Sequence, residues 1–476
     1  MKKIFNLETK NLVGQKVELY GFIAEIRDHG KLIFFDLKDR SGILQCMISQ
    51  ENKFFPLAKE IKPYSVVKII GQVQPRPAHL VNPKIETGKI EVSIEELSIL
   101  SSAKTLPFEV ETDGYEIDEA LRMKYRYLDL RRPRLFKNLR RRHEFLLFIR
   151  NFLDAKGFIE IETPILTKST PEGARDYLVP SRIYPGKFYA LPQSPQQYKQ
   201  LLMVAGVERY FQIARCFRDE DPRGDRQPEF TQIDLEMSYV ERDDVLNLVE
   251  EMFIELVREL YPEKKITYVP FPRISYEEAL NLYGSDKPDL RKNPNDPNEL
   301  AFVFIVDFPM FEWNEKENKW DPMHHPFTQP KLADGSRDKN EILNVLSKSP
   351  EILLSEQYDL VLNGYEVGGG SLRTTDSDIL IKIFEVLGYN REEIEEKFFH
   401  LLEAFSYGVP PHGGIAPGVD RILMILENEP NIREVIAFPK TGEGRDYMMG
   451  APSKVSSNQL KELKLKVEIK ENEING

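Results

Sequence analysis

The sequence has little cysteine, no long apolar run and no excess of positive charge. Cys46 and Cys216 are the only cysteines among 476 residues, and neither belongs to a CxxC pair. A disulfide framework and a zinc ribbon are therefore excluded. The N-terminus has no apolar signal segment, and no run of about 18 apolar residues occurs, so we expect a cytoplasmic protein without a membrane span.

Basic residues are outnumbered by acidic ones. Lys and Arg total 65 against 77 Asp and Glu, and the net charge of −12 argues against a basic coat for indiscriminate nucleic-acid binding. The sequence also lacks a Walker A or GxGxxG pattern, internal repeats and long low-complexity tracts. At roughly 150 residues per domain the length suggests about three domains, and 41% hydrophobic residues predict a folded enzyme.

The first hundred residues have the pattern of β-strands. Near-alternating apolar positions fill three runs within residues 16–48, and two further runs follow at 65–74 and 89–100. About five short strands is the number found in a small Greek-key barrel such as an OB-fold. Half of a β-sandwich is the alternative.

A basic segment follows these strands. Residues 122–142 carry ten Lys or Arg residues and a single acid, Asp129. The pattern is typical either of a solvated helix face or of a stripe that faces RNA. The spacing of apolar residues predicts a helix that begins near Pro133 and runs toward Gly157.

Four later segments mix charged residues with glycines and aromatics, which a core would not tolerate. They are GFIEIETPIL with STPEGARD within 157–176, SPQQYK at 194–199, RCFRDEDPRGDRQPEFTQIDLE at 215–236, and YDLVLNGYEVGGGSLR at 358–373 with GGIAPGVDR at 413–421. In the third segment we expect two strands joined by a charged loop. Arginine's planar, permanent charge suits phosphate there, and Phe230 offers a surface for a nucleobase.

Two pairs of residues indicate ligands. Gln196 and Lys199 share one helix face near a helix N-terminus, where a small anionic group would be stabilised. Asp359 and Glu366 supply hard oxygen ligands suited to Mg²⁺.

Together these segments resemble the three signature motifs of class II aminoacyl-tRNA synthetases, most closely the bacterial type of aspartyl-tRNA synthetase. STPEGARD, SPQQYKQLLM, CFRDEDPRGDRQPEFTQIDLE, MHHPFT, GYEVGGGSLR and GVDR occur in this order, and the resemblance covers nearly the whole chain. It implies an α+β fold, with an N-terminal five-stranded OB-fold β-barrel and a class II catalytic domain built on an antiparallel β-sheet flanked by helices. The implied domains are an anticodon-binding barrel at 1–103, a hinge at 104–132, a catalytic domain at 133–430 and a C-terminal extension at 431–476.

The resemblance also implies an activity. L-aspartate would be ligated to tRNA(Asp) through an aspartyl-adenylate, with ATP as a substrate and Mg²⁺ as the cofactor. His29 stands at a barrel position where histidine is associated with relaxed enzymes that also charge tRNA(Asn), and such an enzyme implies a downstream amidotransferase. A strictly tRNA(Asp)-specific enzyme is the alternative. Pro164 would lie at the interface of a homodimer.

The family's roles carry over residue by residue. Arg218, Glu220 and Arg421 would be catalytic. Aspartate would be bound by Glu172, Ser194, Gln196, Lys199, Arg218, Asp234, His324, His325 and Arg373. ATP would be bound by Arg218, Asp219, Glu220, Gln227, Phe230, Glu366, Gly418, Val419, Asp420 and Arg421. The metal ligands would be Asp359 and Glu366, and the anticodon would be read by Arg27, Phe34, Gln45, Arg76 and Glu91.

The sequence departs from the family pattern in one place. Bacterial enzymes of this type carry an inserted domain where this chain has only a short connection at 292–300. An asparaginyl- or lysyl-tRNA synthetase shares the motifs, but the cations Arg373 and Lys199 favour an anionic substrate. A ligase that acts without tRNA and a synthetase-derived RNA-binding protein without charging activity are further alternatives, and the retained Arg218 and Arg421 argue against the second.

Overall fold

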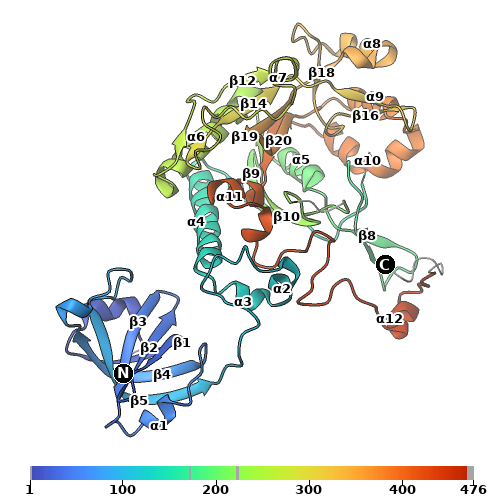
Figure 1. Cartoon of the computed structure of the whole chain (residues 1–476). Helices are drawn as coiled ribbons and strands as arrows, with labels where there is room; N and C mark the ends of the chain where they lie inside the picture. The colour runs from blue at the N-terminus through green and yellow to red at the C-terminus, as the bar shows by residue number, and fades with distance from the viewer. Residues whose placement is uncertain (1–2, 171–172, 221–223, 469–476) are drawn as a thin grey trace. The chain divides into compact units, whose positions relative to one another are not determined.

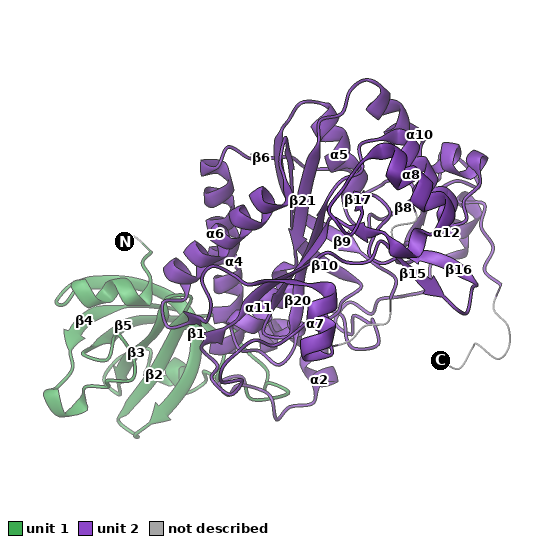
Figure 2. Ribbon diagram, turned by 90° about the horizontal axis from the view of Figure 1, so that it is seen from above, with its two compact units in different colours: residues 1–109 green, residues 110–476 purple. Residues whose placement is uncertain are grey.

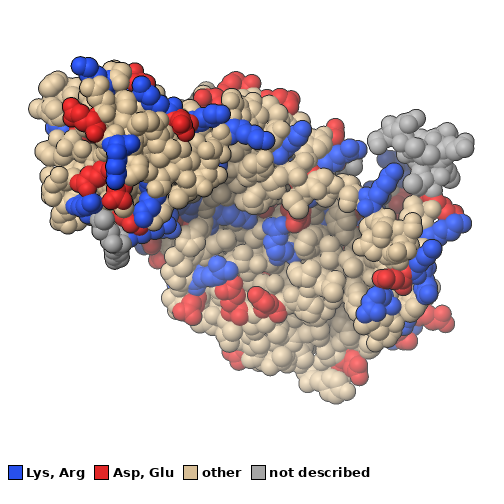
Figure 3. Space-filling model, turned by 90° about the horizontal axis from the view of Figure 1, so that it is seen from below, with Lys and Arg blue, Asp and Glu red and all other residues tan. Residues whose placement is uncertain are grey.

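The computed structural model describes residues 3–170, 173–220 and 224–468 and divides the chain into two compact units, residues 1–109 and 110–476 (Figure 2). The boundary between the two units falls within the segment 104–132. None of the helices in the described ranges combines the length and the apolar character needed to cross a membrane. On the face drawn in Figure 3, basic and acidic side chains of the described residues are interspersed.

Unit 1 is a closed barrel, which confirms the OB-fold prediction and rules out half a sandwich. Its strands pair in the order β1-β2-β3-β5-β4, and every pair is antiparallel except β3 with β5. The barrel closes because apolar side chains alternate inward along each strand, as Ile33, Phe35 and Leu37 do. The elements are η1(Asn6–Asn11), β1(Lys16–Asp28), β2(Leu32–Asp39), β3(Gly42–Ser49), α1(Phe55–Ala58), β4(Val66–Pro75), η2(Ala78–Leu80) and β5(Ile90–Ser101).

Unit 2 is built on an eight-stranded sheet with the order β12-β14-β19-β20-β21-β10-β9-β6. The pairs are antiparallel except at the two edges, where β12 with β14 and β6 with β9 are parallel. The predicted antiparallel sheet is thus confirmed, with parallel edges added. The strands are β6(Ile159–Glu160), β9(Arg209–Phe217), β10(Glu229–Ser238), β12(Arg273–Ser275), β14(Phe302–Val306), β19(Gln357–Leu362), β20(Tyr365–Leu372) and β21(His412–Pro417).

The two faces of this sheet differ in chemistry. Along β10, Ile233, Leu235 and Met237 join the main hydrophobic core beneath α4 and α6, whereas Asp234 and Glu236 point to the opposite face. Figure 1 shows α4 and α6 on one side of the sheet and α5 and α10 on the other. The helices are α2(Glu119–Lys124), α3(Arg126–Asp129), α4(Pro133–Ala155), α5(Gln196–Val204), α6(Arg242–Leu260), α7(Tyr276–Tyr283), α8(Lys339–Lys348), α9(Ser377–Val386), α10(Arg391–Ser406), α11(Val419–Leu426) and α12(Ser457–Glu462).

Short elements complete unit 2. The strand pairs β7(Leu178–Pro180) with β8(Phe188–Ala190), β15(Phe311–Asn314) with β16(Lys319–Pro322), and β17(Pro330–Lys331) with β18(Leu354–Ser355) are antiparallel, and β11(Lys265–Ile266) with β13(Glu299–Leu300) is parallel. The turns η3(Pro350–Ile352) and η4(Ile432–Glu434) are 3-10 helices.

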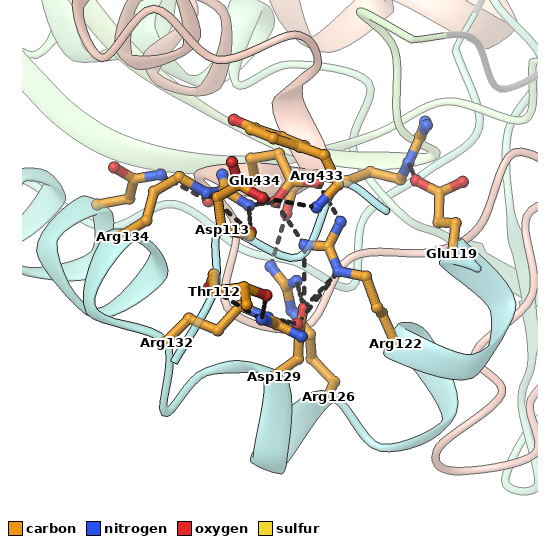
Figure 4. A network of polar contacts seen from close by, with 12 residues as sticks. Thr112, Asp113, Glu119, Arg122, Arg126, Asp129, Arg132, Arg134, Arg433 and Glu434 are labelled. Atoms are coloured by element: carbon orange, nitrogen blue, oxygen red, sulfur yellow. Dashed lines mark hydrogen bonds and ion pairs between the residues drawn. The ribbon is translucent and has the colours of Figure 1, made fainter. Parts of the chain in front are cut away.

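The basic segment is partly internal, so both sequence-based interpretations are wrong for its first half. Arg122, Arg126 and Arg132 are at most 3% exposed and surround the Asp129 carboxylate at 2.6–3.1 Å (Figure 4). Arg122 also pairs with Glu434 at 2.8 Å. Buried guanidinium groups need such partners, and Glu434 could not be foreseen because it lies more than 300 residues away along the chain.

Candidate active site

A cavity of about 430 Å³ lies on the face of the sheet that carries Asp234. Its walls come from β10, β20, α5, the start of α11 and the loop that contains the two neighbouring histidines. The structure brings most of the predicted site residues together here: Ser194, Gln196, Lys199, Arg218, Glu220, Gln227, Phe230, Asp234, His324, His325, Glu366, Arg373, Gly418, Asp420 and Arg421.

Two cations and two carboxylates form the floor of this cavity. Lys199 Nζ lies 2.6 Å from Asp234 Oδ1 and 3.2 Å from Glu236 Oε2. Arg373 pairs bidentately with Glu236, with Nε 2.8 Å from Oε1 and Nη2 3.0 Å from Oε2. All four residues are nearly inaccessible to solvent. The ion pairs hold both cations in place before a substrate arrives.

The two carboxylates titrate in opposite directions. Burial disfavours the charge of Glu236, but Arg373 and Lys199 outweigh it and lower its pKa to about 2. Burial raises the pKa of Asp234 even though Lys199 pairs with it. Asp234 Oδ2 is buried and has no hydrogen-bond partner among the described residues, so it is available to a donor within the cavity.

The pKa values of the two neighbouring histidines are shifted in opposite directions. Burial lowers the pKa of His325 well below its usual value, and Arg373 lowers it further, so the ring is neutral. Arg373 Nη1 donates to His325 Nε2 at 2.9 Å, which places the ring proton on Nδ1. Burial also disfavours a charged His324, but the Asp359 carboxylate 2.9 Å from its Nε2 raises the pKa.

Arg218 and Arg421 also line the cavity. The Arg218 guanidinium lies over the Phe230 ring, 5.1 Å from its centroid. Arg421 donates from Nη1 to the Glu366 carbonyl and pairs through Nη2 with Asp225 at 3.1 Å. Two planar cations and an aromatic ring are suited to a polyphosphate and a nucleobase.

Asp359 and Glu366 stand on the adjacent strands β19 and β20 and are close enough to influence each other. Burial raises the pKa of Asp359 and the Glu366 charge raises it further, whereas Lys287 and Arg421 hold the pKa of Glu366 low despite its burial. Within the described ranges, no group of three His, Cys, Asp or Glu residues could hold a metal ion. Two carboxylates still fit Mg²⁺, because that ion takes its remaining ligands from water and substrate phosphates.

Unpartnered polar atoms gather around this cavity. Buried polar atoms are normally hydrogen-bonded, and those without a protein partner indicate a place for a ligand or water. Six of the cavity's lining residues contribute such an atom among the described residues: Gln196 Nε2, Arg218 Nε, Asp234 Oδ2, His324 Nδ1, Gln357 Oε1 and Arg421 Nε.

Some predicted residues do not line the cavity. Val419 is buried in the main core, and Asp359 lies behind the lining residues His324 and Gln357, to both of which it is hydrogen-bonded. Asp219 donates its backbone N–H to the Arg175 carbonyl and is absent from the walls. Gln227 lines the cavity, but its amide is bonded to the backbone of Lys440. Glu172 lies outside the described residues.

Three of the predicted anticodon residues, Arg27, Gln45 and Glu91, are joined by hydrogen bonds on the barrel, where Gln45 and Glu91 are buried. Arg27 pairs with Asp36 at 2.7 Å and donates to Gln45 at 3.2 Å, and Gln45 in turn donates to Glu91 at 2.7 Å. These contacts run across β1, β2, β3 and β5. His29 packs edge-on against Phe34, with 5.7 Å between the ring centroids. Arg76, at the end of β4, has a buried Nε without a partner in the described part of the chain.

Pro164 lies on a surface rich in exposed apolar side chains. It is itself exposed and follows β6, the edge strand of the sheet. The neighbouring exposed residues with large apolar side chains are Ile159, Ile165, Leu166, Leu178, Ile183, Tyr184, Phe188 and Tyr189.

Comparison with protein families identifies this architecture. A model described as tRNA synthetases class II (D, K and N) matches residues 118–442. The chain belongs to this family. A second model, described as an OB-fold nucleic acid binding domain, matches residues 17–100 and therefore the barrel of the synthetase.

Curated relatives cover the synthetase almost completely. It is 42% identical to an aspartate–tRNA(Asp/Asn) ligase of Syntrophomonas wolfei over 582 aligned positions, covering 96% of this chain and 97% of the relative. A protein of the same name from Dictyoglomus turgidum is 42% identical over 587 positions, covering 97% of each chain. Both alignments are longer than the 476 residues of the synthetase, so the relatives contain residues that it lacks, as expected for a missing insertion.

Solved structures share the fold. A putative aspartyl-tRNA synthetase from Leishmania major has a TM-score of 0.73 at 21% identity, covering 92% of this chain and 94% of that chain. An asparaginyl-tRNA synthetase from Pyrococcus horikoshii, complexed with asparaginyl-adenylate, has a TM-score of 0.72 at 24% identity, covering 93% and 98%.

Sequence reasoning missed several residues that organise the site. Glu236 holds both floor cations, and its alternation with Asp234 along β10 was the only signal for it. Ser371 Oγ accepts from Arg373 Nη1 at 2.7 Å, and Lys287 pairs with Glu366 at 3.1 Å. Asp225 pairs with Arg421, a contact between a loop and α11 that no local pattern indicates.

Proposed function

We propose that this synthetase ligates L-aspartate to tRNA in an ATP-dependent reaction. The observation that supports the proposal is the floor of the cavity. There Glu236 holds Lys199 and Arg373, and these two cations face a space that is lined with unpartnered polar atoms of the described residues. Two fixed cations favour a substrate whose side chain is a carboxylate. The curated relatives of Syntrophomonas and Dictyoglomus are named for the same reaction.

The substrate would be oriented at both of its ends. Its side-chain carboxylate faces Lys199 and Arg373, and its ammonium faces the free Oδ2 of Asp234. Gln196 and Ser194 line the same space, as does His325. This orientation leaves the α-carboxylate directed toward Arg218, where the α-phosphate of ATP would lie.

The chemistry then needs no protein nucleophile. An oxygen of the aspartate α-carboxylate attacks the α-phosphorus of ATP, and pyrophosphate leaves to give aspartyl-adenylate. A hydroxyl of the 3′-terminal adenosine of tRNA next attacks the acyl carbon, and AMP leaves. Arg218 and Arg421 position the phosphates and balance their charge, while Phe230 packs on the adenine. Mg²⁺ held by Asp359 and Glu366 would supply further charge neutralisation when bound.

We further propose that the barrel reads the anticodon through Arg27, Phe34, Gln45, Arg76 and Glu91. Exposed aromatic and polar groups on such barrels stack on and hydrogen-bond the bases of single-stranded loops. His29 beside Phe34 supports a relaxed enzyme that charges tRNA(Asp) and tRNA(Asn). The aspartyl-tRNA(Asn) product would need an amidotransferase to become useful, and the reaction would take place in the cytoplasm with its tRNA substrates.

A homodimer is part of the proposal. Ile165 and Leu166 are exposed next to Pro164 at the edge of the sheet, and large exposed apolar patches mark protein interfaces.

We also propose that the chain is divided into a barrel at 1–103, a connecting segment at 104–132, a catalytic domain at 133–430 and an extension at 431–476.

The deciding experiment measures charging of purified tRNA(Asp) and tRNA(Asn) with labelled aspartate, ATP and Mg²⁺. We expect aspartylation of both tRNAs. Charging of tRNA(Asp) alone would reject the relaxed specificity while keeping the enzyme class. Absence of charging with aspartate, together with charging by asparagine or lysine, would overturn the assignment of the substrate.

A further inference from the structure

One face of α4 is turned toward the segment that follows the last motif. Arg134, Asn138 and Arg142 are four residues apart, so their side chains lie one above another on this face. Arg134 pairs with Glu429 at 2.5 Å and with Glu434 at 2.9 Å. Asn138 donates to Glu429 at 2.6 Å. Arg134 and Asn138 therefore connect α4 to residues 429–434, and Arg134 also donates to the Asp113 carbonyl.

Arg142, the third residue of this face, donates to the Val435 carbonyl at 3.3 Å and makes a second connection that the other two lack. Its Nη1 lies 2.5 Å from Asp420 Oδ1, and its Nη2 donates to Thr231 Oγ1 at 3.1 Å. The other carboxylate oxygen of Asp420 accepts the backbone N–H of Thr231 at 3.0 Å. Asp420 thus bridges α4 and β10, and its carboxylate is used within the protein.

This bridge lies between Phe230, which is proposed to pack on the adenine, and Arg421, which is proposed to position the phosphates. Thr231 directly follows Phe230, and Asp420 directly precedes Arg421 (α11 begins beside α4 in Figure 1). An isolated β-bridge between Gln232 and Gly418 joins the same two segments. The contacts of Thr231 and Asp420, the chain neighbours of Phe230 and Arg421, therefore determine how far the Phe230 ring lies from the Arg421 guanidinium.

We propose that Arg142 is a positioning residue for ATP, which fixes the distance between Phe230 and Arg421 through Asp420. Arg142 does not line the cavity and so acts only through its partners. Its fork-shaped guanidinium can hold the Asp420 carboxylate and the Thr231 hydroxyl at once, which a point charge cannot do equally well. This inference rests on the proposed nucleotide site.

The test measures ATP–pyrophosphate exchange in R142Q and R142K, with ATP and aspartate varied separately. We expect R142Q to raise the KM for ATP by about tenfold, because small displacements of binding groups weaken a site strongly, and to leave the KM for aspartate within about twofold. R142K should recover part of the loss, since a lysine can still pair with one oxygen of Asp420.

N138A is the matched control, because Asn138 lies one turn away on the same helix face and has no contact with Thr231 or Asp420. We expect N138A to lower the melting temperature without changing the KM for ATP. If R142Q lowers the melting temperature as N138A does and leaves the KM for ATP unchanged, Arg142 is only structural and the inference is wrong.

A double-mutant cycle keeps the inference testable if R142Q does not fold. R142K and D420N should change the KM for ATP non-additively, since they act on one contact, whereas additive changes would contradict the bridge. A failure of this inference can be distinguished from a failure of the proposed function. If the unaltered protein exchanges pyrophosphate with an amino acid other than aspartate, the proposed substrate fails, and the effect of Arg142 on ATP is still measured.

Discussion

Replacing Glu236 with glutamine should destabilise unit 2 by an amount that depends on pH. The folded protein lowers the pKa of this buried carboxyl from 4.5 to about 2. At about 1.4 kcal/mol per pKa unit, this shift corresponds to about 3 kcal/mol of stability at neutral pH. Breaking a buried ion pair typically costs about 3–5 kcal/mol, so the pKa shift and the ion-pair argument give similar losses of stability for E236Q.

The sign of the pH dependence follows from the direction of the shift. The pKa of Glu236 is lower in the folded protein than in the unfolded chain. The stabilisation is therefore complete above pH 4.5 and is lost as the pH falls toward 2. By pH 4 about 1 kcal/mol should already be gone. E236Q lacks this contribution at every pH, so the difference between the unaltered protein and E236Q should be largest near pH 7 and smaller at pH 4.

The assay is urea unfolding followed by tryptophan fluorescence. Both tryptophans of the chain, Trp313 and Trp320, lie in β15 and β16 and therefore report on unit 2. E251Q is the matched control, because Glu251 pairs with Lys156 at the surface and should contribute at most about 1 kcal/mol. If E236Q is as stable as E251Q at pH 7, or if its deficit grows toward pH 4, the charge balance inferred for the floor is refuted.

Four further predictions concern the proposed reaction. R218A should abolish aspartate-dependent pyrophosphate exchange while leaving the circular dichroism spectrum unchanged, because Arg218 lines the cavity and contributes no ion pair to the described core. D359N should raise the Mg²⁺ concentration needed for half-maximal exchange several-fold, and an unchanged Mg²⁺ titration would argue against Asp359 as a ligand. Q45A should lower kcat/KM for tRNA charging about tenfold without affecting exchange, since it removes contacts only on the barrel. I165D should shift the protein from dimer to monomer in analytical ultracentrifugation, and a dimer that persists would place the interface elsewhere.

The strands and helices that carry the site could be predicted from local pattern. In the barrel, alternation of apolar and polar residues determines which side chains face inward, and the five predicted runs correspond to β1–β5. The helix expected near Pro133 begins there. Gln232, Asp234 and Glu236 share a face of β10 because the side chains of a strand alternate.

Contacts between distant segments could not be predicted in the same way. Ten basic residues in one stretch indicate an exposed surface unless acids from elsewhere are known to be near. Three of these arginines are buried because they form ion pairs with Asp129 and Glu434, and Glu434 comes from the far end of the chain. The same limitation concealed the role of Asp420, whose neighbour Arg421 lines the cavity while its own carboxylate is bonded to α4 and β10.

The charge of the cavity floor gives a physical reason to favour aspartate over asparagine. Lys199 and Arg373 are both held by Glu236, whose pKa is lowered to about 2, and His325 next to them is neutral, so the floor presents two fixed cations. Aspartate and asparagine both carry an ammonium and an α-carboxylate, so they differ only in the charge of the side chain. The side-chain carboxylate of aspartate can pair with Lys199 and Arg373, whereas the neutral amide of asparagine brings no charge to meet these buried cations. We therefore expect this floor to favour aspartate over its neutral analogue.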